Sequence, residues 1–363
     1  MSSSNLVLTM EFRNYTPFAP ITFESLDVND TPFQVVVLRG TFKIFSDAPL
    51  KPVPDQQPLM SADEFYVQPN TSSVRFESDL APFKPRSDIV INATAHAPRG
   101  RALASWIVSA QVGQLQKQLL VTGPRYWRHH IVSGWRISDP EPCVEVPIRY
   151  ESAYGGQWQH EEEAGVCEEN PVGMGYVNRK HLDKSKPLPA PRIMSPDDLI
   201  IELDKGHKPE GFSAITKSWL PRRKYGGTYD EQWLKKRHPY LPEDFDYSYY
   251  NCAHPDLIYN GYLKGNESVV LKRLHSKHDT LKFSLPAYRV GAAITDKDDY
   301  RYGALGNLDT VYMDVEQMRV YLVWRITLPL YKDGIKLLET KMKQTCEPIK
   351  NEPKKPRMSL NRH

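Results

Sequence analysis

The sequence predicts a mainly β protein: an antiparallel β-sandwich or barrel-like core that carries a large irregular insertion and few short helices. Two observations lead to this fold class. Apolar runs rich in β-branched and aromatic side chains occur in residues 1–150 and again in 256–330. Proline supplies 30 of the 363 residues, about 8% against a typical usage of about 5%, and its scattered placement disfavours long helices.

The N-terminal part, residues 1–150, has the pattern of short strands joined by turns. The strongest predicted strand covers 33–45, where Gly40 indicates a bulge or a bend. The proline-rich, polar stretch 49–70 is expected to leave the sheet. Further strands, spaced as in an antiparallel sandwich or barrel, are predicted over 89–95, 106–112, 119–121 and 131–137.

Strand patterns return after residue 255. Strands are predicted over 268–274 and 281–290, followed by a hairpin over 310–328 that turns near Glu316 and Gln317. Residues 334–344 are expected to form a short helix, and the basic tail that ends at His363 is expected to be disordered.

This organisation predicts one β-rich domain over residues 1–330, followed by the short helix and tail of 331–363. Strands from 1–150 and 256–330 would pair in one core, with 151–255 as an insertion lying across it. That insertion is punctuated by glycine, proline and aromatic residues, most densely in 219–251.

One helix is well specified inside the insertion, over residues 229–237. Thr228 and Glu231 have the spacing of a capping box, and Pro239 ends the helix. Trp233 and Leu234 are expected to face inward.

The aromatic block 219–251 admits two interpretations. Its rings form a small satellite core that orders the insertion, or they face a protein partner, since Trp, Tyr and Arg dominate interface hot spots. Under either interpretation, alanine at Arg222 or Arg223 is expected to leave stability nearly unchanged. The partner-binding candidates are Trp219, Arg222, Arg223, Tyr225, Tyr229, Trp233, Tyr240 and Phe245.

Bulk composition argues against several classes of function. The net charge of +3 gives no support to nucleic-acid binding. No apolar run approaches the roughly 18 residues that a membrane-spanning helix needs, and the N-terminus lacks the pattern of a signal peptide. The 4 cysteines are widely spaced and are interpreted as reduced thiols, which predicts a cytoplasmic protein.

Motifs for catalysis are sparse, and we expect no catalytic residue, cofactor or bound metal. One alternative is a metal-dependent hydrolase or effector-modifying enzyme whose site surrounds His275 and His278, with Cys252, His254 and Asp256 near in sequence. The competing interpretation of the histidine pair is a polar hairpin tip.

An ordered series of phrases in residues 150–267 resembles a known family. The series comprises YESAYGG (150–156), NPVGMGY (170–176), LPAP (188–191), GFSAI (211–215), WLPR (219–222), GTYD (227–230), Trp233, Arg237, Pro239, LP (241–242), DFD (244–246), NCAHPD (251–256) and GNE (265–267). It is similar to the uncharacterised-domain family of Gram-negative bacteria found beside type VI secretion genes, and the resemblance spans about residues 5–330. Ser152, Tyr154 and Met174 depart mildly from the family pattern.

The resemblance implies an adaptor function. Members of that family are encoded beside spike (VgrG), PAAR-tip and toxin genes, and are thought to be adaptor-chaperones that hold an effector and help load it onto the spike. The implied partners are therefore a toxin effector, with or without its PAAR domain, and the VgrG spike. The family contributes no established catalytic residue.

Overall fold

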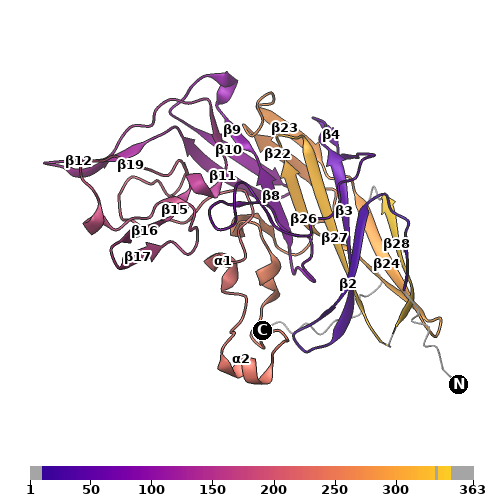
Figure 1. The fold of residues 1–363 in the computed structure, drawn as a ribbon. Helices are drawn as coiled ribbons and strands as arrows, with labels where there is room; N and C mark the ends of the chain where they lie inside the picture. Colours follow the sequence, from indigo (N-terminus) through magenta and orange to yellow (C-terminus); the bar gives the residue numbers. More distant parts are fainter. Residues whose placement is uncertain (1–9, 332–333, 345–363) are drawn as a thin grey trace.

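The computed structural model describes residues 10–331 and 334–344, and β-strands dominate it (Figure 1). Strands account for 44% of the structure and helices for 8%, and the sheets of the described residues close into no barrel, so the predicted mainly β class is confirmed. Three larger sheets and several small ribbons make up the fold.

The largest sheet has seven strands and combines strands from both ends of the chain. β3 pairs antiparallel with β27 from Phe33↔Pro329 to Lys43↔Arg319, and β8 pairs parallel with β26. The predicted hairpin with a turn near Glu316 and Gln317 is confirmed as β26 and β27. The members are β2 (Ala19–Leu26), β3 (Pro32–Lys43), β5 (Lys51–Pro52), β8 (Ser87–Asn92), β21 (Ile258–Tyr259), β26 (Asn307–Asp314) and β27 (Arg319–Pro329).

Aromatic packing explains the glycine in the middle of β3. Trp324 of β27 stacks on Phe18 with ring centroids 5.1 Å apart, and Phe42 lies against both rings. A Cβ on Gly40 would come within 2.9 Å of Phe18 and 2.7 Å of Phe42. The pairing with β27 continues through Gly40 without a register shift, so the predicted bulge is wrong. The glycine instead makes room for the rings.

The second sheet has six strands in the order β20-β11-β10-β22-β23-β4. Trp106, Val108, Ala110 and Val112 of β10 are buried, as their predicted alternation requires. The predicted strand over 281–290 is divided between β23 and the next sheet. The members are β4 (Ala48–Pro49), β10 (Ser105–Val112), β11 (Leu115–Thr122), β20 (Ile193–Met194), β22 (Ser268–Lys272) and β23 (Thr280–Ser284).

A four-stranded sheet corrects the prediction for residues 334–344. The segment expected to be a helix is the strand β28, which pairs antiparallel with β24 from Ile335↔Asp296 to Gln344↔Tyr288 and parallel with β1. Long-range pairing on both edges outweighs a weak local preference for helix. The predicted disordered tail, 345–363, lies outside the described residues. The members are β1 (Glu11–Asn14), β24 (Tyr288–Asp296), β25 (Arg301–Leu305) and β28 (Ile335–Gln344).

The rest of the described chain forms short ribbons and single turns of helix. The ribbons consist of β6 (Glu64–Phe65) with β7 (Val74–Phe76); β9 (Thr94–His96) with β14 (Glu145–Pro147); β12 (Tyr126–His130) with β13 (Gly134–Ile137) and β19 (Leu188–Pro189); β15 (Tyr154–Gly155) with β18 (Met174–Gly175); and β16 (Gln157–His160) with β17 (Glu163–Val166). The α-helices are α1 (Leu220–Arg223) and α2 (Glu231–Lys236), and the 3-10 turns are η1 (Pro98–Gly100), η2 (Tyr150–Ser152), η3 (Arg179–His181), η4 (Tyr247–Tyr250) and η5 (Pro255–Leu257). None of the helices that the structure describes has the length and apolar character needed to cross a membrane.

A buried ion cluster joins the middle segment to the large sheet. Arg222 of α1 lies 2.6 Å from Glu77, and Lys84 lies 2.8 Å from Asp88 of β8 and 3.7 Å from Glu77. Burial alone would raise the pKa of Glu77, but the cations Arg222 and Lys84, together with Lys217, outweigh it and lower that pKa to about 2. We call Glu77, Lys84, Asp88 and Arg222 the buried ion cluster.

Asp88 also fixes the backbone that follows the aromatic block. Its carboxylate accepts the backbone N–H groups of Cys252 and Ala253 at 3.0 and 3.2 Å and the side-chain amide of Asn251 at 3.0 Å. One carboxylate on β8 therefore positions the end of the insertion directly.

The strand pairing predicts that an N-terminal fragment, residues 1–150, does not fold alone. Without β27 and β26, the buried faces of β3 and β8 lose their neighbours and expose apolar surface. The fragment should show no cooperative thermal transition by circular dichroism, whereas the full chain should show one. A cooperative melt of the isolated fragment would contradict the shared sheet.

Arg222 and Arg223 provide a matched pair for the buried ion cluster. Arg222 is only 3% exposed, so the expectation of a near-neutral substitution is wrong for it. Arg222→Ala leaves Glu77 without its nearest cation and should cost about 3–5 kcal/mol in urea unfolding. Arg223 pairs with Glu168 at the surface, so Arg223→Ala should change stability by at most about 1 kcal/mol. Equal effects of the two substitutions would argue against the cluster.

Candidate functional site

The segment around α2 projects from the body of the protein (Figure 1). The helix covers Glu231–Lys236, shorter than the predicted 229–237. Asp230 is its N-cap, because the Asp230 carboxylate accepts the backbone N–H of Trp233 at 2.8 Å. The predicted capping role of Thr228 is wrong: Thr228 instead donates its backbone N–H and its hydroxyl to Asp244, at 2.9 and 2.7 Å.

Specific contacts hold this projection in place. Arg237 forms a bidentate ion pair with Asp30, in the turn between β2 and β3, at 2.7 and 2.9 Å. Trp233 lies edge-on to Tyr229, with ring centroids 4.7 Å apart, and donates its indole N–H to the Tyr240 carbonyl at 2.9 Å. The surface of the projection is therefore ordered by polar contacts rather than by a deep apolar core.

The predicted partner-binding residues divide into three groups. Trp219, Arg222 and Phe245 are buried, which argues against direct contact with a partner. Tyr225 and Trp233 are half-buried, and Arg223, Tyr229 and Tyr240 are exposed. Both interpretations of the aromatic block therefore hold in part, since its two ends pack inward and its middle faces outward.

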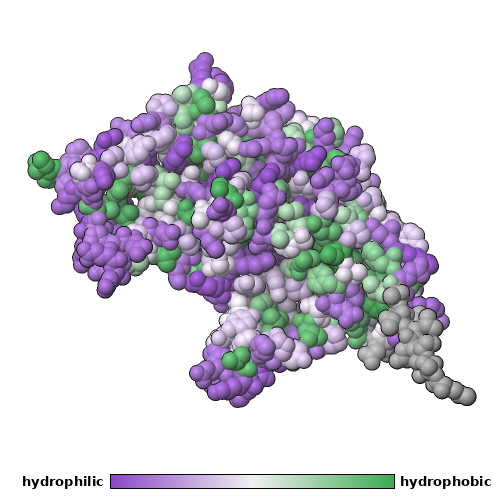
Figure 2. Space-filling view, in the orientation of Figure 1, coloured by the Kyte–Doolittle hydropathy of each residue, from purple (hydrophilic) through white to green (hydrophobic). Residues whose placement is uncertain are grey.

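Leu234 adds to the exposed group. It was expected to face inward, but it is 61% exposed, so that prediction is wrong. With Tyr229, which is 57% exposed, and Tyr240 it gives the α2 projection an apolar surface patch. Figure 2 shows this patch as a small apolar area on an otherwise hydrophilic lobe. We call Tyr229, Leu234 and Tyr240 the α2 patch.

A second exposed apolar feature was missed by the sequence analysis. Ile131 and Val132 are each 99% exposed at the turn between β12 and β13, where a strand over 131–137 was predicted. Only Gly134–Ile137 of that stretch is a strand. Figure 2 shows apolar surface at the far end of this hairpin. Two adjacent β-branched residues resemble a strand in sequence, so periodicity alone could not reveal the turn.

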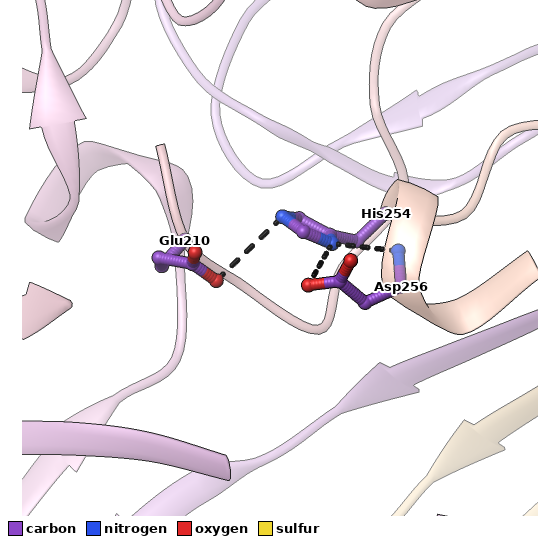
Figure 3. Close-up of side chains that lie close together, drawn as sticks. All are labelled: Glu210, His254 and Asp256. Atoms are coloured by element: carbon purple, nitrogen blue, oxygen red, sulfur yellow. Dashed lines mark hydrogen bonds and ion pairs between the residues drawn. The ribbon is translucent and has the colours of Figure 1, made fainter. Parts of the chain in front are cut away.

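A cluster of polar side chains lies on the side of the six-stranded sheet that carries β11. Among the described residues, Glu210, His254 and Asp256 form the one set of three possible metal ligands, with ligand atoms within 4.8 Å of one another. In Figure 3 the His254 ring lies between the two carboxylates. The sequence analysis had noted His254 and Asp256 but not Glu210, which carries no motif of its own.

Lys117 of β11 occupies the position that a cation would take in this cluster. Its ammonium donates to Glu210 and, at 2.7 Å, to Asp256. Burial, and secondarily the Lys117 charge, lowers the pKa of His254 to about 4, so its ring is neutral at pH 7. Burial raises the pKa of Glu210, although Lys117 opposes this effect. The arrangement is a self-neutralised contact that joins the insertion to β11.

The His275 and His278 pair lies at the tip of the hairpin between β22 and β23, as the hairpin-tip interpretation predicted. The two ring centroids are 5.0 Å apart. The structure brings neither Cys252 nor His254 to this pair: Cys252 lies beside Lys84, and His254 beside Glu210. In the described part of the chain, no third possible ligand joins the two histidines within 4.8 Å.

The neutral state of His254 predicts a pH-dependent contribution to stability. The folded-state pKa of about 4 lies below the ordinary value of 6.5, so this contribution is complete above pH 6.5 and is lost as the pH falls toward 4. His254→Asn keeps an acceptor for the Asp256 backbone N–H, which the His254 ring accepts at 3.2 Å. Urea unfolding of both proteins across this pH range should therefore show the stability advantage of the parent chain shrinking by about 2–3 kcal/mol. A constant difference would show that His254 is protonated in the fold.

Comparison with known proteins places the chain in one family. No match was found among the curated proteins or among the solved structures. A family model described as an uncharacterized protein conserved in bacteria (DUF2169) matches residues 29–325, which include the large sheet, the insertion and the α2 projection. The chain therefore belongs to the DUF2169 family of proteins conserved in bacteria.

Proposed function

We propose that the protein is an adaptor-chaperone that binds a toxin effector in the cytoplasm and aids its loading onto the VgrG/PAAR spike of a type VI secretion system. The observation that carries the binding step is the α2 patch on an ordered projection. The loading step is supported by the ordered series of phrases from 150 to 267, which resembles adaptors encoded beside spike and toxin genes.

The α2 patch has the properties of a contact surface for protein. Tyr229, Leu234 and Tyr240 leave apolar surface in water although they lie on a rigidly held segment. Burial of one such side chain by a partner is worth about 1.5–3 kcal/mol. Because Arg237 and Trp233 already fix the backbone and its neighbouring rings, binding would order few additional groups.

The chemistry of the patch also indicates what the effector should present. Arg223, Lys235 and Lys236 are exposed on or near the projection, beside the apolar side chains. A complementary effector surface would combine an apolar groove for Leu234 and the tyrosines with carboxylates at its rim. Such a surface would be prone to aggregation in the free effector, which is the condition that a chaperone relieves.

Substitution of the patch should separate binding from folding. In the double variant Tyr229→Ser/Leu234→Ser, affinity for the toxin effector encoded beside the gene should fall by about 100-fold, since two exposed apolar contacts are lost. Its melting temperature should match that of the parent chain, because neither side chain is buried. Isothermal titration calorimetry with purified effector gives the affinity.

Val67→Ser is the matched control, because Val67 is 75% exposed and lies outside the projection. It should bind the effector like the parent chain. If the parent chain neither retains nor stabilises the effector at micromolar concentration, the adaptor proposal fails. If the effector binds the parent chain and the double variant equally, the adaptor proposal stands and the α2 patch is excluded as its surface.

A further inference from the structure

A groove of about 710 Å³ lies between the η1 turn and the tip of the β22–β23 hairpin. It is far from α2 in the fold, because η1 follows β9 at the opposite end of the molecule (Figure 1). Four cationic side chains and one carboxylate line it: Arg99, Arg101, Arg273, Lys277 and Asp279. The net charge of the whole chain is only +3, so this groove is a local concentration of positive charge.

Most of that positive charge has no counter-ion in the fold. Arg99, Arg101 and Lys277 are exposed, and none of them has an ion-pair partner among the residues that the structure describes. Arg273 faces Asp279 at a long 3.8 Å between Nε and Oδ1. Like charges that converge on one groove repel one another, so an anionic ligand would relieve an existing electrostatic cost.

The two walls of the groove are joined by backbone hydrogen bonds. His96 donates its N–H to the Arg273 carbonyl at 2.8 Å, and the Arg273 guanidinium donates to the Ile107 carbonyl at 2.9 Å. Arg99 and Arg273 both have left-handed backbone, with φ of 57° and 60°. Such conformations cost a non-glycine residue about 1–2 kcal/mol each, and they concentrate at ligand-binding positions. The groove is therefore formed before any ligand arrives.

The floor of the groove narrows the class of ligand. Ala97, Pro98 and Leu103 give it an apolar base beneath the cationic rim. Its volume greatly exceeds that of one phosphate ion and falls in the range of sites for larger ligands. Its lining includes no Phe, Tyr or Trp on which a nucleic-acid base could stack. A strip of protein chain that alternates carboxylates with apolar side chains satisfies both the rim and the floor.

We propose that this groove binds an acidic, partly apolar peptide segment of a partner protein. Arg99, Arg101 and Lys277 bind its carboxylates, and the apolar floor receives the side chains between them. This assignment gives the histidine pair a role in recognition. Burial, and then the nearby charges of His278, His96 and Lys277, lowers the pKa of His275, so its ring offers a neutral surface at pH 7.

Fluorescence anisotropy with a defined probe tests the assignment on the full chain. The probe is a labelled peptide of about 12 residues that alternates Glu with Leu, and its partner probe has Gln in place of every Glu, both at about 50 mM salt. The acidic peptide should bind at least about tenfold more tightly than the Gln peptide. The triple variant Arg99→Glu/Arg101→Glu/Lys277→Glu should abolish that preference.

The matched control is Lys180→Glu/Lys184→Glu/Lys205→Glu, which makes the same change of charge at exposed lysines outside the groove. It should leave the affinity for the acidic peptide within about twofold of the parent value. Equal loss in both triple variants would reduce the effect to nonspecific charge and overturn the proposal. So would equal binding of the two peptides, or tighter binding of an oligothymidine of equal charge that the groove variant abolishes. Each result is independent of whether α2 binds an effector.

Discussion

The buried ion cluster is the interaction on which the rest of the structure depends. Glu77 precedes β8, Asp88 lies on it, Lys84 lies between them in sequence, and Arg222 comes from the distant insertion. Charges removed from water are costly unless each finds a partner. Sheet and insertion must therefore be present together, because either part alone would leave uncompensated charge in an apolar interior. The α2 projection inherits its position from this requirement.

Much of the fold could be predicted from sequence, because the core strands carry clear apolar patterns. The hairpin 310–328 and the strand near 33–45 needed only periodicity and β-branched content. The exceptions have one cause in common. Residues 335–344 form a strand because β1 and β24 accept them as a neighbour, and no local pattern reports that pairing. Thr228 fits a capping box, yet Asp244 binds it and Asp230 caps the helix.

The candidate site was predictable in place but not in orientation. The unusual density of rings in 219–251 did indicate an ordered segment with both packing and exposed surface. Which side chain faces water depends on tertiary contacts: Arg222 is drawn inward by Glu77, and Leu234 remains outside. The exposed pair Ile131 and Val132 and the cationic groove at η1 involve residues whose local sequence is ordinary. Their meaning arises only when separate segments meet.

The ion pair between Glu77 and Arg222 also constrains how the family can diverge. A change at one position alone strands a charge where water cannot reach it, so such a variant is purged before a second change can compensate. Exchange of the pair for apolar residues requires both substitutions at nearly the same time. Positions 77 and 222 should therefore covary among relatives, and the 145 residues between them make that covariation a long-range marker of the fold.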